Sequence, residues 1–206
     1  MAYIKTIDRE AAQGDLDALY AKIAGPDGRV DNILMAHSLR PHTLEGHMAL
    51  YKVVLHHRGN ALPKWMLESI GVLVSAINNC QYCVDHHLAG LKRLVRDEER
   101  YTKLEAALLA VADDPQKLTD AFTQKEHAAL SYAAKLTGAP AAITENDIAI
   151  LRAHGLEDGE ILEVNQVAAY FAYANRTVLG LGCSTQGEEL GLSPGDNEDP
   201  DNWSHG

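Results

Sequence analysis

Two cysteines separated by two residues, Cys80 and Cys83, are followed by His86 and His87 in the stretch NNCQYCVDHHL. The thiolate form of cysteine is the nucleophile in peroxide and disulfide chemistry, and a nearby imidazole favours that form. Two thiols at this spacing can also close a disulfide once one of them has been oxidised to sulfenic acid. Because the chain has only three cysteines in 206 residues, the close pair predicts redox chemistry.

The geometry of a helix that starts at Cys80 decides which histidine faces the sulfurs. At roughly 100° per residue, Cys83 lies on the same side as Cys80, His87 falls between the two, and His86 points away. His87 is therefore the candidate base. Cys83 is four residues before His87 and is therefore expected to have the lower pKa of the two thiols, although Cys80 gains from the dipole at the helix start and leaves the opposite order open.

Glu68 can reach His87 only if the chain reverses direction between them. In one straight helix Glu68 would lie about 18 Å from Cys80, which is too far. Asn78 and Asn79 interrupt the apolar run, and a reversal there would lay two helices side by side with Glu68 level with His87. A carboxylate in that place orients and polarises the imidazole. The sequence therefore predicts a Glu68–His87 pair.

The apolar spacing is helical along almost the whole chain, which predicts an all-α fold. A stripe over 16–23 ends at GPDG, and Pro41 and Pro63 suit the first turns of two further helices. The helix over 63–78 is apolar nearly all round and is expected to be buried. A fourth helix starts at the cysteines, Thr123 and Glu126 have capping-box spacing, and a last apolar helix covers about 158–178.

Composition predicts a globular domain with an acidic end. Hydrophobic residues make up 46% of the chain and the formal net charge is −11, which suits a packed core and disfavours a nucleic-acid partner. No run approaches the ~20 apolar residues that cross a bilayer, so we expect a cytoplasmic protein with no membrane partner. We expect one helical domain over 1–185 and a solvated, flexible tail over 186–206, although Trp203 leaves room for docking on a neighbouring subunit.

Other roles of the same residues stay open from the sequence alone. The cysteine pair and both histidines are zinc-ligand types, although no second cysteine pair accompanies them and adjacent histidines diverge on a helix. Glu68 could instead be a charge near a helix start. Cys183 is expected to be a small apolar residue far from the pair. No metal or organic cofactor is expected.

The spacing of the four candidate residues resembles that of a known family. Glu68, eleven residues, CQYC, three residues and His87 resemble the motif of the alkylhydroperoxidase D-like proteins, in the carboxymuconolactone decarboxylase superfamily. The segments GRVDNILMAHSLRPHTLEGHMALY and AAYFAYANRTVLGLG are similar to its peroxidase-related branch, and the likeness covers roughly residues 15–183. It implies a helical bundle with Cys83 as the attacking thiol, Cys80 as the resolving thiol, and Glu68 with His87 as a proton relay. Tyr82 departs from the pattern, because the best-known members have histidine there.

The resemblance also implies an activity and partners. It implies a thiol-dependent peroxidase or disulfide reductase that acts on a hydroperoxide and is restored by a dithiol reductant, lipoylated or thioredoxin-like. Trimers, hexamers or dimers are implied, and the apolar helices over 63–78 and 158–178 also favour a homo-oligomer. The alternative is a non-enzymatic redox sensor or partner-binding protein that uses the same disulfide. Lactone decarboxylation is disfavoured because that branch of the superfamily does not depend on a cysteine pair.

Overall fold

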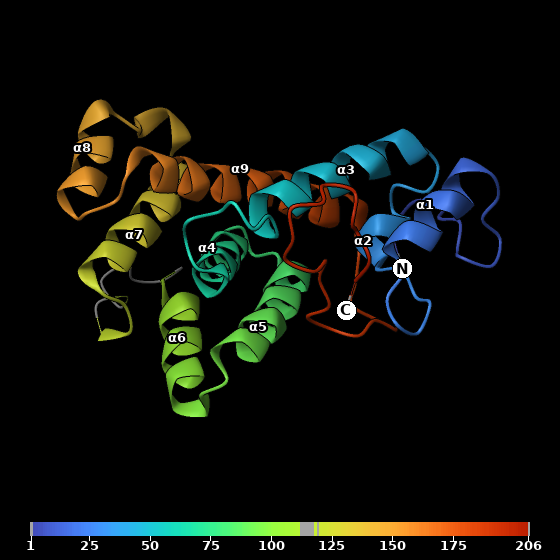
Figure 1. The fold of residues 1–206 in the computed structure, drawn as a ribbon, viewed down its shortest axis with the longest axis horizontal. Helices are drawn as coiled ribbons and strands as arrows, with labels where there is room; N and C mark the ends of the chain where they lie inside the picture. The colour runs from blue at the N-terminus through green and yellow to red at the C-terminus, as the bar shows by residue number, and fades with distance from the viewer. Residues whose placement is uncertain (1, 112–117, 119, 206) are drawn as a thin grey trace.

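The computed structural model describes residues 2–111, 118 and 120–205, and within these ranges the regular elements are helices (Figure 1). In chain order they are α1 (Asp15–Ile23), α2 (Asn32–Met35), α3 (Pro41–Leu55), α4 (Lys64–Ile77), α5 (Gln81–Val95), α6 (Glu98–Ala110), α7 (Gln124–Gly138), the short 3₁₀ turn η2 (Pro140–Ala142), α8 (Glu145–Ala153) and α9 (Asp158–Leu181). The predicted all-α fold is confirmed. None of the described helices is both long and apolar enough to cross a membrane.

Helix α4 is the element around which the others pack. It contacts α3, α5, α6, α7 and α9, and it lies near the middle of the molecule (Figure 1). Every residue from Met66 to Ser75 is buried, which confirms the predicted burial of this helix. Because helices of the same chain cover it, α4 offers no apolar face to another subunit. The helix over 63–78 therefore gives no support to the expected homo-oligomer.

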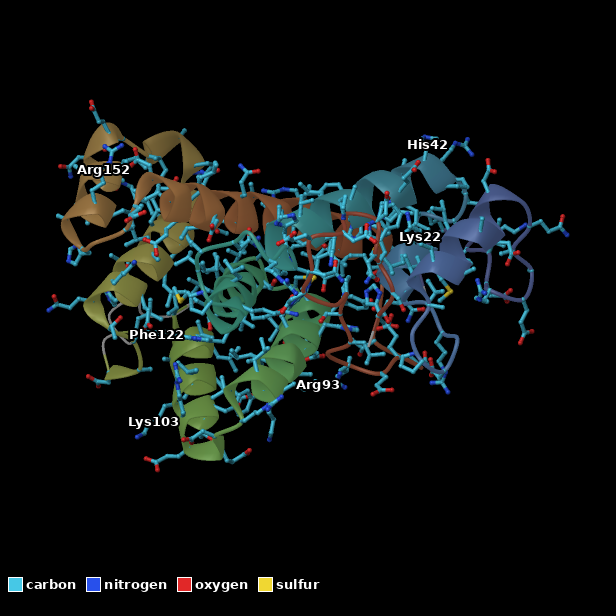
Figure 2. All side chains as sticks on the ribbon, viewed as in Figure 1. Lys22, His42, Arg93, Lys103, Phe122 and Arg152 are labelled. Carbon is cyan, nitrogen blue, oxygen red and sulfur yellow. The ribbon has the colours of Figure 1, made fainter. Side chains whose placement is uncertain are left out.

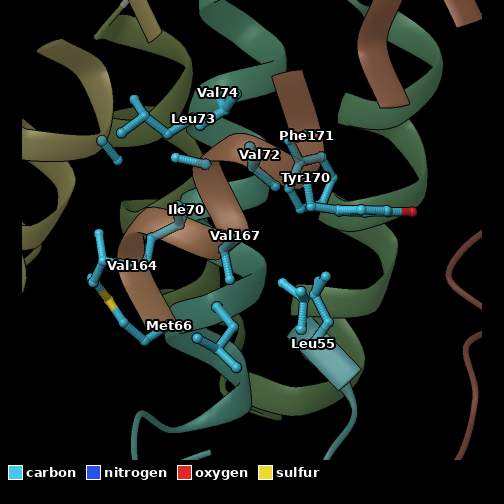
Figure 3. Close-up of a cluster of buried hydrophobic side chains, with 14 of the residues drawn as sticks. Leu55, Met66, Ile70, Val72, Leu73, Val74, Val164, Val167, Tyr170 and Phe171 are labelled. Carbon is cyan, nitrogen blue, oxygen red and sulfur yellow. The ribbon is translucent and has the colours of Figure 1, made fainter. Parts of the chain in front are cut away.

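The longest helix, α9, packs along α4 and brings aromatic rings to it. Figure 3 shows Val164, Val167 and Phe171 of α9 close to α4. A Cβ atom at Gly71 of α4 would overlap the ring of Phe171, so glycine permits this close approach. The Phe171 ring also contacts the candidate site, because its centre lies 4.5 Å from that of the His87 ring, with the two planes nearly perpendicular.

Residues 183–205, called here the C-terminal segment, fold back over α3 and α5 (Figure 1). Trp203 is only 3% exposed, and Lys22 Nζ lies 3.9 Å from its ring centre. Asp196 pairs with Lys64 at 2.9 Å. Arg93 of α5, labelled in Figure 2, donates hydrogen bonds to two carbonyl oxygens of the segment at 3.1 Å each.

The segment is thus docked at several points, whereas many of its other residues are exposed as expected of a solvated tail. Three of its carboxylates pair with cations on distant helices of the same chain, and Trp203 is buried against this chain. Opposite charges brought together in this way offset the repulsion that favours an extended acidic tail.

Candidate active site

The turn between α4 and α5 places the cysteines opposite Glu68. Asn79 adopts a left-handed conformation with φ of 55°, which asparagine tolerates better than most residues. The Cys80 amide then donates to the Ser75 carbonyl at 2.9 Å, and Cys80 becomes the N-cap of α5. The predicted chain reversal is confirmed, and α5 runs back along α4.

Glu68 and His87 form a buried carboxylate–imidazole pair across these two helices. Glu68 Oε2 lies 2.6 Å from His87 Nδ1, and Glu68 is 2% exposed. Burial alone would raise the pKa of Glu68, but the charge and hydrogen bond of His87, with smaller contributions from His56 and Lys64, hold that pKa below its ordinary value. Glu68 is therefore ionised at neutral pH and fixes which nitrogen of His87 faces it. The alternative that Glu68 is an exposed charge at a helix start is wrong.

The two cysteines are reduced, buried and hydrogen-bonded to each other. The hydrogen bond from the Cys83 thiol is the main reason that the pKa of Cys80 falls to about 7, and the backbone N–H of Cys83 and the side chain of Asn175 add to it against the effect of burial. The same hydrogen bond, together with burial, raises the pKa of Cys83 well above its ordinary value. The expectation that Cys83 has the lower pKa is therefore wrong, because the hydrogen bond between the two sulfurs favours the thiolate on Cys80.

We expect the resting thiolate to be found on Cys80. Thiolate absorbance followed against pH should show a transition near the Cys80 pKa of about 7. Cys80→Ser should remove it, because burial still raises the pKa of the remaining Cys83 thiol. Cys183→Ser is the matched control and should leave the transition in place. A transition near neutrality that persists in Cys80→Ser would instead put the thiolate on Cys83.

Cys183 lies closer to the pair than expected. It packs against the small apolar cluster that contains Cys80 and Cys83, because the end of α9 passes beside the start of α5. Burial raises the pKa of Cys183 to about 11, so this thiol stays protonated and is a poor nucleophile at neutral pH. The sequence-based description of Cys183 as remote is wrong, whereas its description as a small apolar residue is consistent with its packing.

A cavity of about 50 Å³ opens onto Cys83, Glu68 and His87 together. Cys80 does not line it and lies behind Cys83, so only one thiol of the pair faces the cavity. A small molecule in this cavity would thus meet the sulfur of Cys83 beside the carboxylate–imidazole pair. A thiol nucleophile and its base must act on the same bound molecule, and here the three side chains line one cavity.

Two tyrosines that complete the cavity were not predicted as site residues. Tyr51 of α3 and Tyr170 of α9 both line it. Burial, followed by the nearby negative charge of Glu68 for Tyr51 and of Cys83 for Tyr170, raises both pKa values well above the ordinary one. Both phenols therefore remain protonated and can donate hydrogen bonds. In the sequence, Tyr51 has the helical spacing of a core residue. No local pattern links it to Tyr170, which follows 119 positions later.

Tyr82 and His86 belong to a second cluster, centred on Glu188 of the C-terminal segment. The Tyr82 hydroxyl donates to Glu188 Oε1 at 2.8 Å, and His86 Nε2 lies 2.9 Å from Glu188 Oε2. His86 thus points away from the sulfurs, as its helical position predicted. Among the residues that the structure describes, no three or more His, Cys, Asp or Glu side chains are grouped so that they could hold a metal ion.

Comparisons with known proteins agree with this fold. Residues 41–135 match the model of the Carboxymuconolactone decarboxylase family. The AhpD core of a peroxidase-related protein from Ralstonia eutropha JMP134 is 23% identical with a TM-score of 0.74, covering 89% of this chain and 91% of that one. A peroxidase-related protein from Silicibacter sp. TM1040 is 29% identical with a TM-score of 0.65, covering 76% and 77%. The debrominase Bmp8 is 16% identical with a TM-score of 0.67, covering 89% and 90%. No curated protein matches the chain.

The helical fold is similar to that of the alkylhydroperoxidase D-like proteins. The match to the Carboxymuconolactone decarboxylase family model covers a little under half of the chain and contains all four residues of the predicted motif.

Proposed function

We propose that this protein is a thiol-dependent peroxidase of the alkylhydroperoxidase D-like class, acting through Cys83, Cys80, His87 and Glu68. The observation that carries the proposal is the single cavity onto which Cys83 and the Glu68–His87 pair open together, with Cys80 hydrogen-bonded behind. In this proposal Cys83 attacks, because substrate reaches its sulfur first. The lower resting pKa of Cys80 does not oppose this role, since a proton can move between two hydrogen-bonded sulfurs.

The proposed reaction has three steps. His87 accepts the Cys83 proton, the thiolate attacks the terminal oxygen of the hydroperoxide, and the O–O bond breaks to give a sulfenic acid and an alkoxide that takes the proton and leaves as an alcohol. Cys80 then attacks the sulfenic sulfur to form the disulfide, and its thiol proton joins the displaced hydroxide, which leaves as water. A dithiol reductant, lipoylated or thioredoxin-like, returns two electrons and two protons to the disulfide.

The principal experiment is mass analysis of the protein after one equivalent of hydroperoxide. The parent should lose two hydrogens in a Cys80–Cys83 disulfide, with Cys183 left free because its pKa of about 11 keeps it protonated. Cys80→Ser should instead gain one oxygen on Cys83. Peptide mapping that found Cys183 in the main disulfide would contradict the assignment of the resolving thiol, and the proximity of Cys183 to the pair makes this a stringent test.

The alternative of a redox sensor or partner-binding protein uses the same disulfide without turnover. Steady-state measurement with excess dithiol separates the two functions, because a peroxidase continues to consume peroxide whereas a sensor oxidises once and stops. Continued consumption at many equivalents per subunit is the expected result.

A cytoplasmic homo-oligomer, as a trimer, hexamer or dimer, remains part of the proposal. Large apolar side chains stay exposed on α9, including Leu162 at 60% and Leu179 at 48%, and burial against a second copy would remove them from water. Light scattering at micromolar concentration should give a mass above that of one chain, and a monomer would refute this expectation.

A further inference from the structure

Two cavities of very different size lie on either side of the C-terminal segment. The inner one, at Cys83, measures about 50 Å³, and the outer one, between the α1–α2 region and residues 186–192, about 570 Å³. A cavity of about 150 Å³ is known to hold benzene. The inner cavity therefore accepts a molecule the size of hydrogen peroxide but not one that carries an aromatic ring, whereas the outer cavity has ample room for such a molecule.

The C-terminal segment builds half of the boundary between the two cavities. Asp31, Leu34, Leu192 and His205 line both cavities, and two of these four residues belong to the segment. Of the two residues that the segment contributes to the boundary, Leu192 is the one with an apolar side chain. A change in this side chain alone would alter the space beside Cys83 without touching the cysteines, Glu68 or His87.

Two contacts hold this boundary against α5. Glu188 accepts from Tyr82 and contacts His86, as described above, and its side chain is 4% exposed. Gly191 has a φ of +79°, and a Cβ atom there would lie 2.8 Å from backbone atoms of Ala89 and Gly90. Only glycine fits this position, because a side chain would push the segment away from α5.

We propose that Leu192, held in place by the Glu188 and Gly191 contacts, determines the size of hydroperoxide that reaches Cys83. This inference rests on the proposed function and gives it a substrate class: hydrogen peroxide and the smallest organic hydroperoxides react with the segment in place. A bulky hydroperoxide occupies the outer cavity and reaches the sulfur only when the boundary is removed.

The first test compares Leu192→Ala with Leu190→Ala, whose side chain lines neither cavity. The measured quantity is the ratio of the rate constant for cumene hydroperoxide to that for hydrogen peroxide. Leu192→Ala should raise this ratio by about tenfold or more, in the range by which a few methyl groups in a pocket discriminate substrates. Leu190→Ala should keep the parent ratio.

The second test uses two glycines that share a left-handed backbone. Gly191→Ala and Gly187→Ala both place a side chain at positive φ, but a Cβ atom at Gly187 meets nothing within 4 Å. Gly191→Ala should therefore raise the ratio and Gly187→Ala should not. A parent protein that consumes both peroxides equally fast, or a ratio that is unchanged in both Leu192→Ala and Gly191→Ala, would overturn the proposal.

A readout without peroxide separates this inference from the proposed function. In a Cys80→Ser background, the rate of Cys83 alkylation is measured with iodoacetamide, which has no ring, and with the bulkier N-phenylmaleimide. Leu192→Ala should accelerate the bulkier reagent selectively. If no variant consumes peroxide but this selectivity is found, the peroxidase function fails and the size limit stands; equal acceleration of both reagents overturns the size limit itself.

Discussion

Replacing Cys83 with serine should abolish peroxide consumption, because a hydroxyl group does not supply the thiolate that attacks oxygen. Cys83 is the one member of the pair that lines the inner cavity, so no other sulfur can take over the first step. Cys80→Ser should still permit one round of reaction and then stop, with a sulfenic acid left on Cys83. Peroxide consumption followed in steady state, with excess dithiol, distinguishes the two variants.

The matched control for both variants is Cys183→Ser. This substitution removes a thiol from the same apolar cluster and should leave turnover at the parent rate. A Cys83→Ser protein that still forms one equivalent of alcohol would show that Cys80 attacks first. In that case the resting charge, and not access from the cavity, would decide which sulfur is the nucleophile.

Glu68→Gln should slow the oxidation of Cys83 by about 10²–10⁴-fold near neutral pH, the usual contribution of a general base. The amide keeps the shape of the carboxylate but loses the charge that polarises His87 across the 2.6 Å contact. His87→Ala should be at least as damaging, because it removes the base itself. Stopped-flow measurement of the first oxidation isolates this step from disulfide reduction.

The pH dependence gives a further check on the same pair. Because the pKa of Glu68 is lower in the folded protein than its ordinary value, ionised Glu68 stabilises the fold at neutral pH, and this contribution is lost as pH falls through the folded-state pKa. The thermal stability of Glu68→Gln should therefore depend less on pH in the acidic range than that of the parent. Glu105→Gln on α6, whose carboxylate accepts a hydrogen bond from the Tyr101 hydroxyl, is the control for a half-buried glutamate away from the site.

If the Cys83 thiol of Glu68→Gln is oxidised at the parent rate, Glu68 has no part in the reaction, and the mechanism is reduced to His87 and the cysteines.

Most of the helices could be predicted because their ends carry local signals. Proline opens α3 and precedes α4, and Thr123 with Glu126 forms the capping box that starts α7. Helix α6 was not predicted. Its predecessor α5 ends at Arg96, a non-glycine residue in the left-handed conformation with φ of 51°, so neither glycine nor proline marks the boundary. Local chemistry finds a helix end only when the residue type reflects the backbone conformation.

Some residues of the candidate site could be predicted from local sequence in the same way, and others could not. Glu68 and His87 are 19 positions apart on two successive helices, and helical geometry with one reversal was enough to bring them together. Tyr51, Tyr170 and Glu188 come from segments whose relative placement only the packed structure defines. The acidic end of the chain was interpreted as solvated because the cations that pair with it are 96 to 179 positions away in sequence.

The buried Trp203 gives the C-terminal segment an intrinsic optical probe. The chain has two tryptophans, and the other, Trp65, stacks on Phe122 at the far side of α4. In a Trp65→Phe background, indole emission would come from Trp203 alone, two residues from a histidine that borders both cavities. Movement of the segment away from Lys22 would expose that indole to water and shift its emission to longer wavelength. Any movement of the segment that borders the cavity at Cys83 can therefore be followed in real time, without a label, while peroxide is added.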